Sequence, residues 1–141
     1  KRTYRGEIIP PESGEFVSDD NLFNYQAKVI RQLAEAESCV IIGRCADYVL
    51  GDYSNVINTF IYAYKDDRLN RIMDIYKLTE KQAADKIKKT DRERKLYYEA
   101  RTGREWGGIE SNSMLFNTGN GNPEDRQQGM TELYQKRYEE A

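Results

Sequence analysis

The stretch Cys39-Val40-Ile41-Ile42-Gly43-Arg44 decides the fold class of this chain. Its apolar run is short, β-branched and unbroken by polar residues, which is typical of a strand buried on both faces of a parallel sheet. Residues 56–64 (VINTFIYAY) are rich in β-branched and aromatic side chains and predict a second strand. Met114-Leu115-Phe116 predicts a short third strand.

Helical patterns lie between and around these strands. Thr79 and Gln82 form a capping box, and Pro123 suits the first turn of a helix. Helices are predicted over residues 19–37, 46–50, 66–76, 80–100 and 124–139. Strands that alternate with helices indicate an α/β fold with an open parallel sheet flanked by helices. We expect a single domain over residues 1–141, with residues 1–18 as an extended lead-in.

Composition excludes several classes of protein. The chain has no histidine, which rules out His-dependent triads and most zinc hydrolase sites, and we expect no metal site among its residues. Its longest apolar run is far shorter than the ~20 residues that span a bilayer, so a membrane is not expected as a partner. The two cysteines, Cys39 and Cys45, are too few for a disulfide scaffold. A soluble cytoplasmic protein with reduced thiols is therefore expected.

The candidate functional residues follow the predicted strands, because ligands of open α/β sheets bind outside the carboxyl ends of the strands. They are Arg44, residues 64–67 and residues 117–119. Arg44 either holds a phosphate bidentately or only forms an ion pair with Asp47 or Asp66. Asn117-Thr118-Gly119 either presents polar groups to a base or forms a simple turn.

Residues 86–104 form a basic segment with eight Lys and Arg residues and three acidic residues. Its charge is +5, in a chain whose net charge is −2. It either neutralises a polyphosphate or a nucleic-acid backbone, or is a solvated helix face paired at i, i+4 spacing. Tyr97 and Tyr98 point about 100° apart on a helix, so one of them packs and the other is exposed or faces a ligand. Trp106 is expected to anchor a loop. Cys45, without a His partner, is expected to fill space rather than act as a nucleophile.

Several motifs occur together in a fixed order. They are residues 43–50 (GRCADYVL), residues 60–63 (FIYA), Asp91-x-x-Arg94-x-x-Tyr97-Tyr98, Thr102-Gly103 and Trp106. This set resembles the cytidylate kinase-like family. The resemblance runs from about Asn21 to the last helix.

The resemblance implies a P-loop nucleoside monophosphate kinase that transfers the γ-phosphoryl group of ATP, with Mg²⁺, to a CMP-like acceptor. It also implies a helical lid over residues 66–108. By position, the acceptor-binding residues are Arg44, Asp47 and Arg101, the catalytic lid cations are Arg92 and Arg94, with Lys88 and Lys89 beside them, and the donor-adenine loop is Asn117, Thr118 and Gly119.

Two departures from the family pattern stand out. Cys45 occupies the third place of a Gly-Arg-Asp motif, where Asp47 is the available substitute. No Gly-x-x-x-x-Gly-Lys-[Ser/Thr] loop occurs in residues 1–141. The resemblance places that loop, its strand and the Mg²⁺ ligands upstream of Lys1. We therefore expect an incomplete N-terminus that lacks the N-terminal strand or strands, and no phosphoryl transfer by residues 1–141 alone.

Two alternative functions remain open. One is a non-catalytic nucleotide-binding or regulatory module that keeps Arg44 and the lid. The other is an RNA-contacting protein that uses residues 86–104, although nucleic acid is the less favoured partner. The pattern predicts no oligomeric state.

Overall fold

A computed structural model describes residues 19–119 and 123–138. The predicted lead-in, residues 1–18, lies outside the described residues. The elements in chain order are α1 (Asp19–Ala36), α2 (Ala46–Val49), β1 (Thr59–Tyr62), α3 (Lys65–Tyr76), α4 (Glu80–Thr102), the 3₁₀ turn η1 (Ile109–Ser111), β2 (Met114–Asn117) and α5 (Pro123–Tyr138). All five predicted helices are confirmed, with ends that differ by one or two residues. No helix in this described part is long and apolar enough to cross a bilayer.

The chain divides into two compact units. The first contains the described residues up to Val56 together with Tyr98–Gly103, and the second contains Ile57–Tyr97 and the described residues from Arg104 onward. Helix α4 therefore contributes to both units. The prediction of a single domain stays a prediction.

The core of the first unit lies between α1 and α2. Phe23, Ala27 and Ile30 recur at i, i+4, i+7 on α1 and are buried. They pack in one cluster with the buried side chains of residues 45–50, and Ile41 and Tyr98 pack against this cluster. The amphipathic period that predicted α1 therefore identified its buried face.

The prediction of a buried strand at residues 39–43 is wrong for this structure. Residues 39–43 form no strand, and Val40 and Ile42 are 92% and 89% exposed. Only Ile41, between them, packs on the core of the first unit. A strand exists through hydrogen bonds to a neighbour, and β1 and β2 pair only with each other among the described residues. The apolar sequence of residues 39–43 does not show whether a neighbouring strand is present to pair with them.

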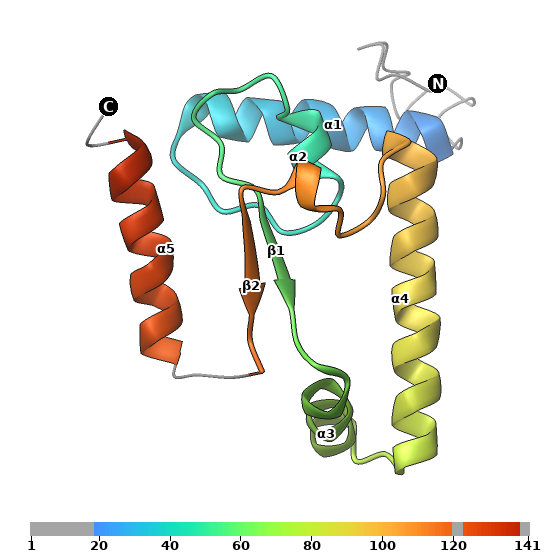
Figure 1. The fold of residues 1–141 in the computed structure, drawn as a ribbon. Coiled ribbons are helices and arrows are strands. Elements are labelled where there is room, and N and C mark those ends of the chain that lie inside the picture. Colours follow the sequence, from blue (N-terminus) through green and yellow to red (C-terminus); the bar gives the residue numbers. More distant parts are fainter. Residues whose placement is uncertain (1–18, 120–122, 139–141) are drawn as a thin grey trace. The chain divides into compact units, whose positions relative to one another are not determined.

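The sheet of the second unit is the parallel pair β1 and β2, which lie side by side in Figure 1. Their register runs from Thr59 opposite Met114 to Tyr62 opposite Asn117. Both strands were predicted, although β1 is shorter than residues 56–64. With the helices that follow each strand, the mixed α/β fold with a small parallel sheet is confirmed.

The loop before η1 packs on this sheet through its aromatic residue. The ring of Trp106 meets that of Phe60 edge-on, with centroids 5.5 Å apart and planes at 80°. Gly107 has φ 77°, and a Cβ there would lie 2.9 Å from Cζ of Phe60. The expectation that Trp106 anchors a loop is confirmed.

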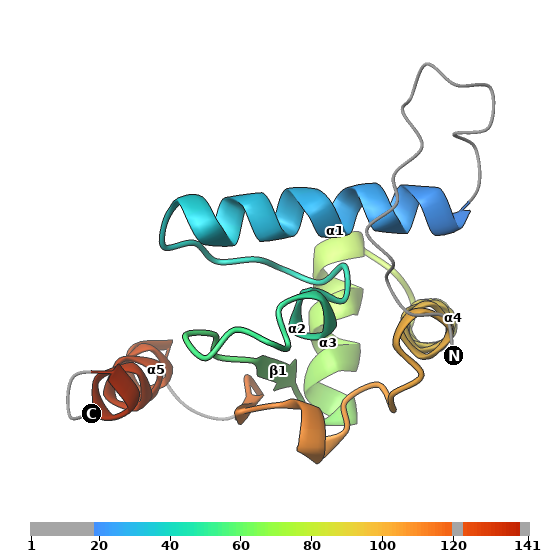
Figure 2. The same cartoon turned by 90° about the horizontal axis from the view of Figure 1, so that it is seen from above.

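Helices α3 and α4 are joined by a short turn and held by polar contacts. The capping box at the start of α4 forms, because the Gln82 amide donates to Thr79 Oγ1 and the Thr79 amide donates to Gln82 Oε1. The Arg68 guanidinium of α3 donates to both carboxylate oxygens of Asp91 on α4, at 2.7 Å each. Helix α3 is seen end-on in Figure 1 and lengthwise in Figure 2, whereas α4 does the reverse, so the two helices cross rather than run side by side.

The two cysteines of the first unit lie in different environments. Cys39 is exposed and Cys45 is buried. Burial raises the pKa of the Cys45 thiol from 9.0 to about 11; nearby Asp47 also raises this pKa and Arg101 lowers it. The expectation that Cys45 fills space is consistent with a thiol that stays protonated at neutral pH.

Substituting Gly107 is expected to destabilise the protein more than substituting Gly103. Both have positive φ, but nothing lies within 4 Å of a Cβ at Gly103. Gly103→Ala should cost about 1 kcal/mol from its backbone conformation alone, and Gly107→Ala about 2–4 kcal/mol because the Phe60 ring must also move. Urea unfolding followed through Trp106 fluorescence measures both losses. Equal losses would contradict this packing.

One thiol per chain should react with a thiol reagent in the native protein at pH 8. With a pKa of about 11, Cys45 is thiolate in only about one molecule in a thousand at that pH, and burial blocks access as well. Cys39→Ser should remove the fast-reacting thiol, and Cys45→Ser should leave it. Two thiols reacting at similar rates in the folded protein would overturn the assignment.

Candidate functional site

A left-handed turn presents Arg44 in front of α2. Gly43, Arg44 and Cys45 have φ values of 70°, 57° and 56°, and the Ala46 amide donates to the Gly43 carbonyl at 3.1 Å. Only glycine adopts such φ values without cost, and each of the other two residues pays about 1–2 kcal/mol. Two non-glycine residues kept in this conformation form a strained turn of the kind that clusters at ligand-binding sites.

Arg44 is exposed and makes no ion pair or hydrogen bond with any residue that the structure describes. The alternative in which it pairs with Asp47 or Asp66 is therefore not formed here. Its guanidinium retains five donors in a planar fork, which is the geometry that a phosphate or carboxylate accepts. The position of the turn, at the end of an extended segment, is the one that the sequence predicted for Arg44, although that segment is not a strand.

Asp47 is tied to the C-terminal end of α4. The Tyr98 hydroxyl donates to Asp47 Oδ2 at 2.5 Å, across 51 residues of sequence. Asp47 is half-buried, and its second oxygen, Oδ1, has no partner among the described residues. Of the two adjacent tyrosines, Tyr98 therefore packs and Tyr97 is the more exposed, at 37%. No local pattern links Tyr98 to Asp47, so this hydrogen bond could not be predicted from the sequence.

Arg101 lies one turn beyond Tyr98. Its guanidinium carbon lies 5.6 Å from the centroid of the Phe23 ring, a cation–π contact. Arg101 and Asp47 both act on the Cys45 thiol, in opposite directions. The structure thus gathers the three predicted acceptor-binding residues, Arg44, Asp47 and Arg101, in the first unit.

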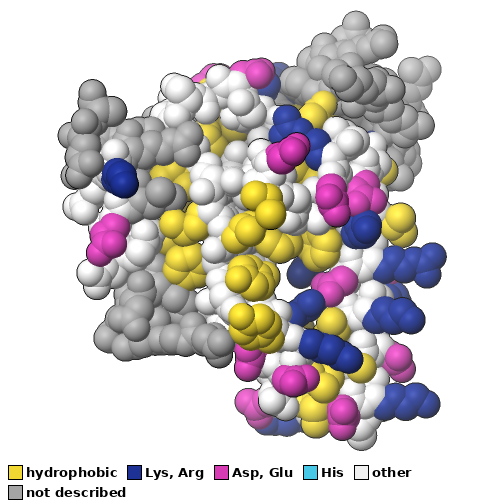
Figure 3. Space-filling view, viewed as in Figure 1, with side chains coloured by type: hydrophobic (Ala, Val, Ile, Leu, Met, Phe, Trp, Pro, Cys, Tyr) yellow, Lys and Arg dark blue, Asp and Glu magenta, His cyan; other side chains and the backbone are white. Residues whose placement is uncertain are grey.

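The basic segment on α4 is only partly neutralised. Lys86 lies over the Tyr76 ring, 4.5 Å from its centroid, and Lys89 faces Glu93 at 4.0 Å. Lys88, Arg92 and Arg94 make no ion pair, hydrogen bond or ring contact with the described part of the chain. Figure 3 shows Lys and Arg side chains projecting from the edge formed by α4. Pairing at i, i+4 spacing therefore does not account for Lys88, Arg92 or Arg94 within the described residues.

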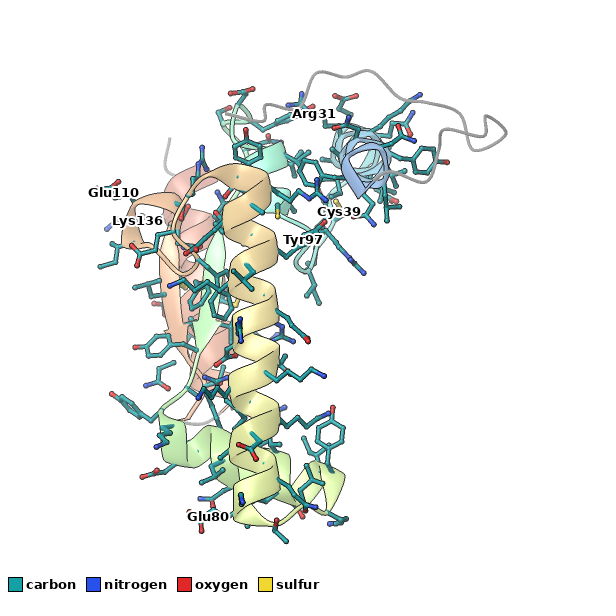
Figure 4. The ribbon with its side chains drawn as sticks, turned by 90° about the vertical axis from the view of Figure 1, so that its right-hand side faces the viewer. Arg31, Cys39, Glu80, Tyr97, Glu110 and Lys136 are labelled. Carbon is teal, nitrogen blue, oxygen red and sulfur yellow. The ribbon has the colours of Figure 1, made fainter. Side chains whose placement is uncertain are left out.

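Figure 4 shows α4 lengthwise, from Glu80 to beyond Tyr97. Arg92 and Arg94, two residues apart in this helix, lie on opposite sides of it. Residues two positions apart are separated by about 200° around the helix axis, so one ligand cannot contact both side chains while α4 stays helical. Arg94 shares a stripe at i, i+4, i+7 spacing with residues that are half-buried, namely Ile87, Asp91, Tyr98 and Arg101. Arg92 shares the opposite, exposed stripe with Lys88 and Lys95.

The predicted donor-base loop lies at the carboxyl ends of β1 and β2, in the second unit. The Thr118 amide donates to the Tyr62 carbonyl at 2.7 Å, which continues the strand pairing. The Gly119 amide donates to Asn117 Oδ1 at 2.9 Å. A Cβ at Gly119 would overlap the Asp67 carboxylate, which comes from the first turn of α3. The sequence had marked residues 64–67 as following a strand, but it could not show this contact.

A divalent cation needs a group of side chains that can bind it. No group of three or more Cys, Asp or Glu residues within the described ranges could hold a metal ion. The described residues therefore form no metal site built from protein side chains alone, and no ligand of Mg²⁺ is assigned to them.

Comparisons with known proteins agree with the motifs. The model of the cytidylate kinase-like family matches residues 2–120. A crystal structure of an uncharacterized protein from Eubacterium ventriosum ATCC 27560 is similar to this chain, with a TM-score of 0.78 and 30% sequence identity over 85% of this chain and 67% of that one. No curated protein matches. From the family match over most of its length, this chain belongs to the cytidylate kinase-like family.

Proposed function

We propose that this protein is a nucleotide kinase that transfers the γ-phosphoryl group of ATP to a CMP-like nucleoside monophosphate. Membership of the cytidylate kinase-like family supports a kinase in general. The observation that carries the proposal is Arg44, an exposed guanidinium without a partner among the described residues, held in a strained left-handed turn. Strain and an unused bidentate donor are both explained if the turn binds an anion.

In this proposal Arg44 binds the phosphate of the acceptor. Two of its N–H groups donate to two phosphate oxygens, which fixes the orientation of the phosphate as well as its position. Arg101 adds a second positive charge in the same unit, and its stem is anchored over Phe23. Tyr98 holds Asp47 through one oxygen, which leaves Oδ1 to accept a hydrogen bond from the acceptor nucleoside.

Arg94 is assigned to the transferring phosphoryl group. Charge spreads over the equatorial oxygens during phosphoryl transfer, and a guanidinium that meets them lowers the barrier. Both arginines are exposed, and Arg94 is preferred over Arg92 because its neighbours along the same side of α4, Asp91 and Tyr98, are half-buried. Mg²⁺, when bound with ATP, would neutralise phosphate charge during the transfer.

Arg44→Ala is expected to weaken CMP binding by about 2 kcal/mol, or about 30-fold in Kd, because it removes charge-assisted hydrogen bonds. Calorimetric titration of the full chain with CMP measures this loss. Lys28→Ala is the matched control, since Lys28 is an exposed cation of the same unit, on α1. Unchanged CMP affinity together with a lowered Tm in Arg44→Ala would contradict the proposal and make Arg44 structural.

Arg94→Ala should lower kcat by about 100-fold or more, whereas Arg92→Ala should change it by about twofold or less. The assay is ADP release from ATP in the presence of CMP, by a longer chain that includes the Gly-x-x-x-x-Gly-Lys-[Ser/Thr] loop expected upstream of Lys1. Equal losses in both variants would contradict the division of α4 into two faces. Saturable CMP binding without any ADP release by that longer chain would reject the kinase and favour a non-catalytic nucleotide-binding module.

A further inference from the structure

The carboxylate of Asp67 lies directly against the backbone of Gly119. Any Cβ at position 119 would occupy the space that Oδ2 of Asp67 fills, so the contact requires glycine there. Asp67 lies in the first turn of α3, which follows β1, and Gly119 follows β2. The carboxylate is therefore held at the carboxyl edge of the parallel pair, where α/β sheets bind their ligands.

This carboxylate has no partner in the part of the chain that the structure describes. Asp67 is half-buried, and among residues 19–119 and 123–138 it makes no hydrogen bond or ion pair. The neighbouring cation, Arg68, is engaged by both oxygens of Asp91. A favourable interaction with the N-terminus of α3 accounts for an acidic residue in the first turn, but exposed Asp66 provides the same interaction without touching Gly119.

The loop beside Asp67 is fixed by its own hydrogen bonds. Both the amide and the hydroxyl of Thr118 donate to the Tyr62 carbonyl, and the Gly119 amide donates to Asn117 Oδ1. Because Oδ1 of Asn117 faces the loop, its Nδ2 group is turned away from that bond. The edge therefore offers a fixed carboxylate acceptor from Asp67 and an amide donor from Asn117.

We propose that Asp67 accepts a hydrogen bond from the exocyclic amino group of the donor base, and that Asn117 Nδ2 donates to the adjacent ring nitrogen. The inference rests on the proposed function, which supplies a donor nucleotide at this loop. Adenine presents an amino group next to an acceptor nitrogen, which complements this pair. Asp67 is then the residue that determines selectivity for a 6-aminopurine.

The test compares ATP with purine riboside 5′-triphosphate, which lacks only the amino group. Equilibrium titration of the full chain, without an acceptor, should give about tenfold or more tighter binding of ATP, because a hydrogen bond to a charged group is lost in the analogue. Asp67→Ala should bring the two affinities within about twofold of each other. Asp66→Ala, the matched control in the same helical turn, should keep the preference for ATP.

Equal affinities in the unaltered protein, retention of the preference in Asp67→Ala, or no binding of ATP would each overturn the inference. Its failure is separable from that of the kinase proposal. If the protein phosphorylates CMP but binds ATP and the analogue equally well, only the role of Asp67 is rejected. If Asp67→Ala abolishes the preference for ATP but the protein does not phosphorylate CMP, only the kinase proposal is rejected.

Discussion

The hydrogen bond from Tyr98 to Asp47 is the contact on which the candidate acceptor site depends. It joins the last turns of α4 to α2, and so holds the end of a 23-residue helix against the turn that carries Arg44. The same contact places Arg101 over Phe23 and near Cys45. Tyr98 also packs against the buried cluster that contains Cys45 and Ala46, so apolar packing holds the same parts of the chain together. The Tyr98 hydroxyl thus connects the candidate acceptor residue Asp47 to α4.

Helix α4 separates its charges by face. Asp91 binds Arg68, and Lys86 lies over Tyr76, so these residues stabilise the second unit. Arg92 and Arg94 make no such contact with the described residues, yet they point to opposite sides. A count of positive charges over residues 86–104 therefore overstates the charge that any one ligand can meet. An RNA-contacting role for the exposed stripe stays a prediction.

Local signals predicted the helices well because they act within one or two turns. The capping box at Thr79, the apolar period of α1 and the proline at the start of α5 each specify an end or a face of a helix. The strand at residues 39–43 was wrong for the opposite reason. Its assignment depends on a hydrogen-bonded neighbour, and the apolar character of Val40 and Ile42 carries no information about that neighbour.

The sequence by itself determined the family, the order of helices and strands, and the candidate residues, because motifs and periods are properties of short stretches. It placed residues 117–119 correctly at the end of β2, whereas the strand predicted before Arg44 does not form. Only the tertiary structure decided which side chains are already engaged. The bond of Asp47 to Tyr98 and the contact of Asp67 with Gly119 each join residues about 50 positions apart. Packing in three dimensions creates such contacts, and no local pattern encodes them.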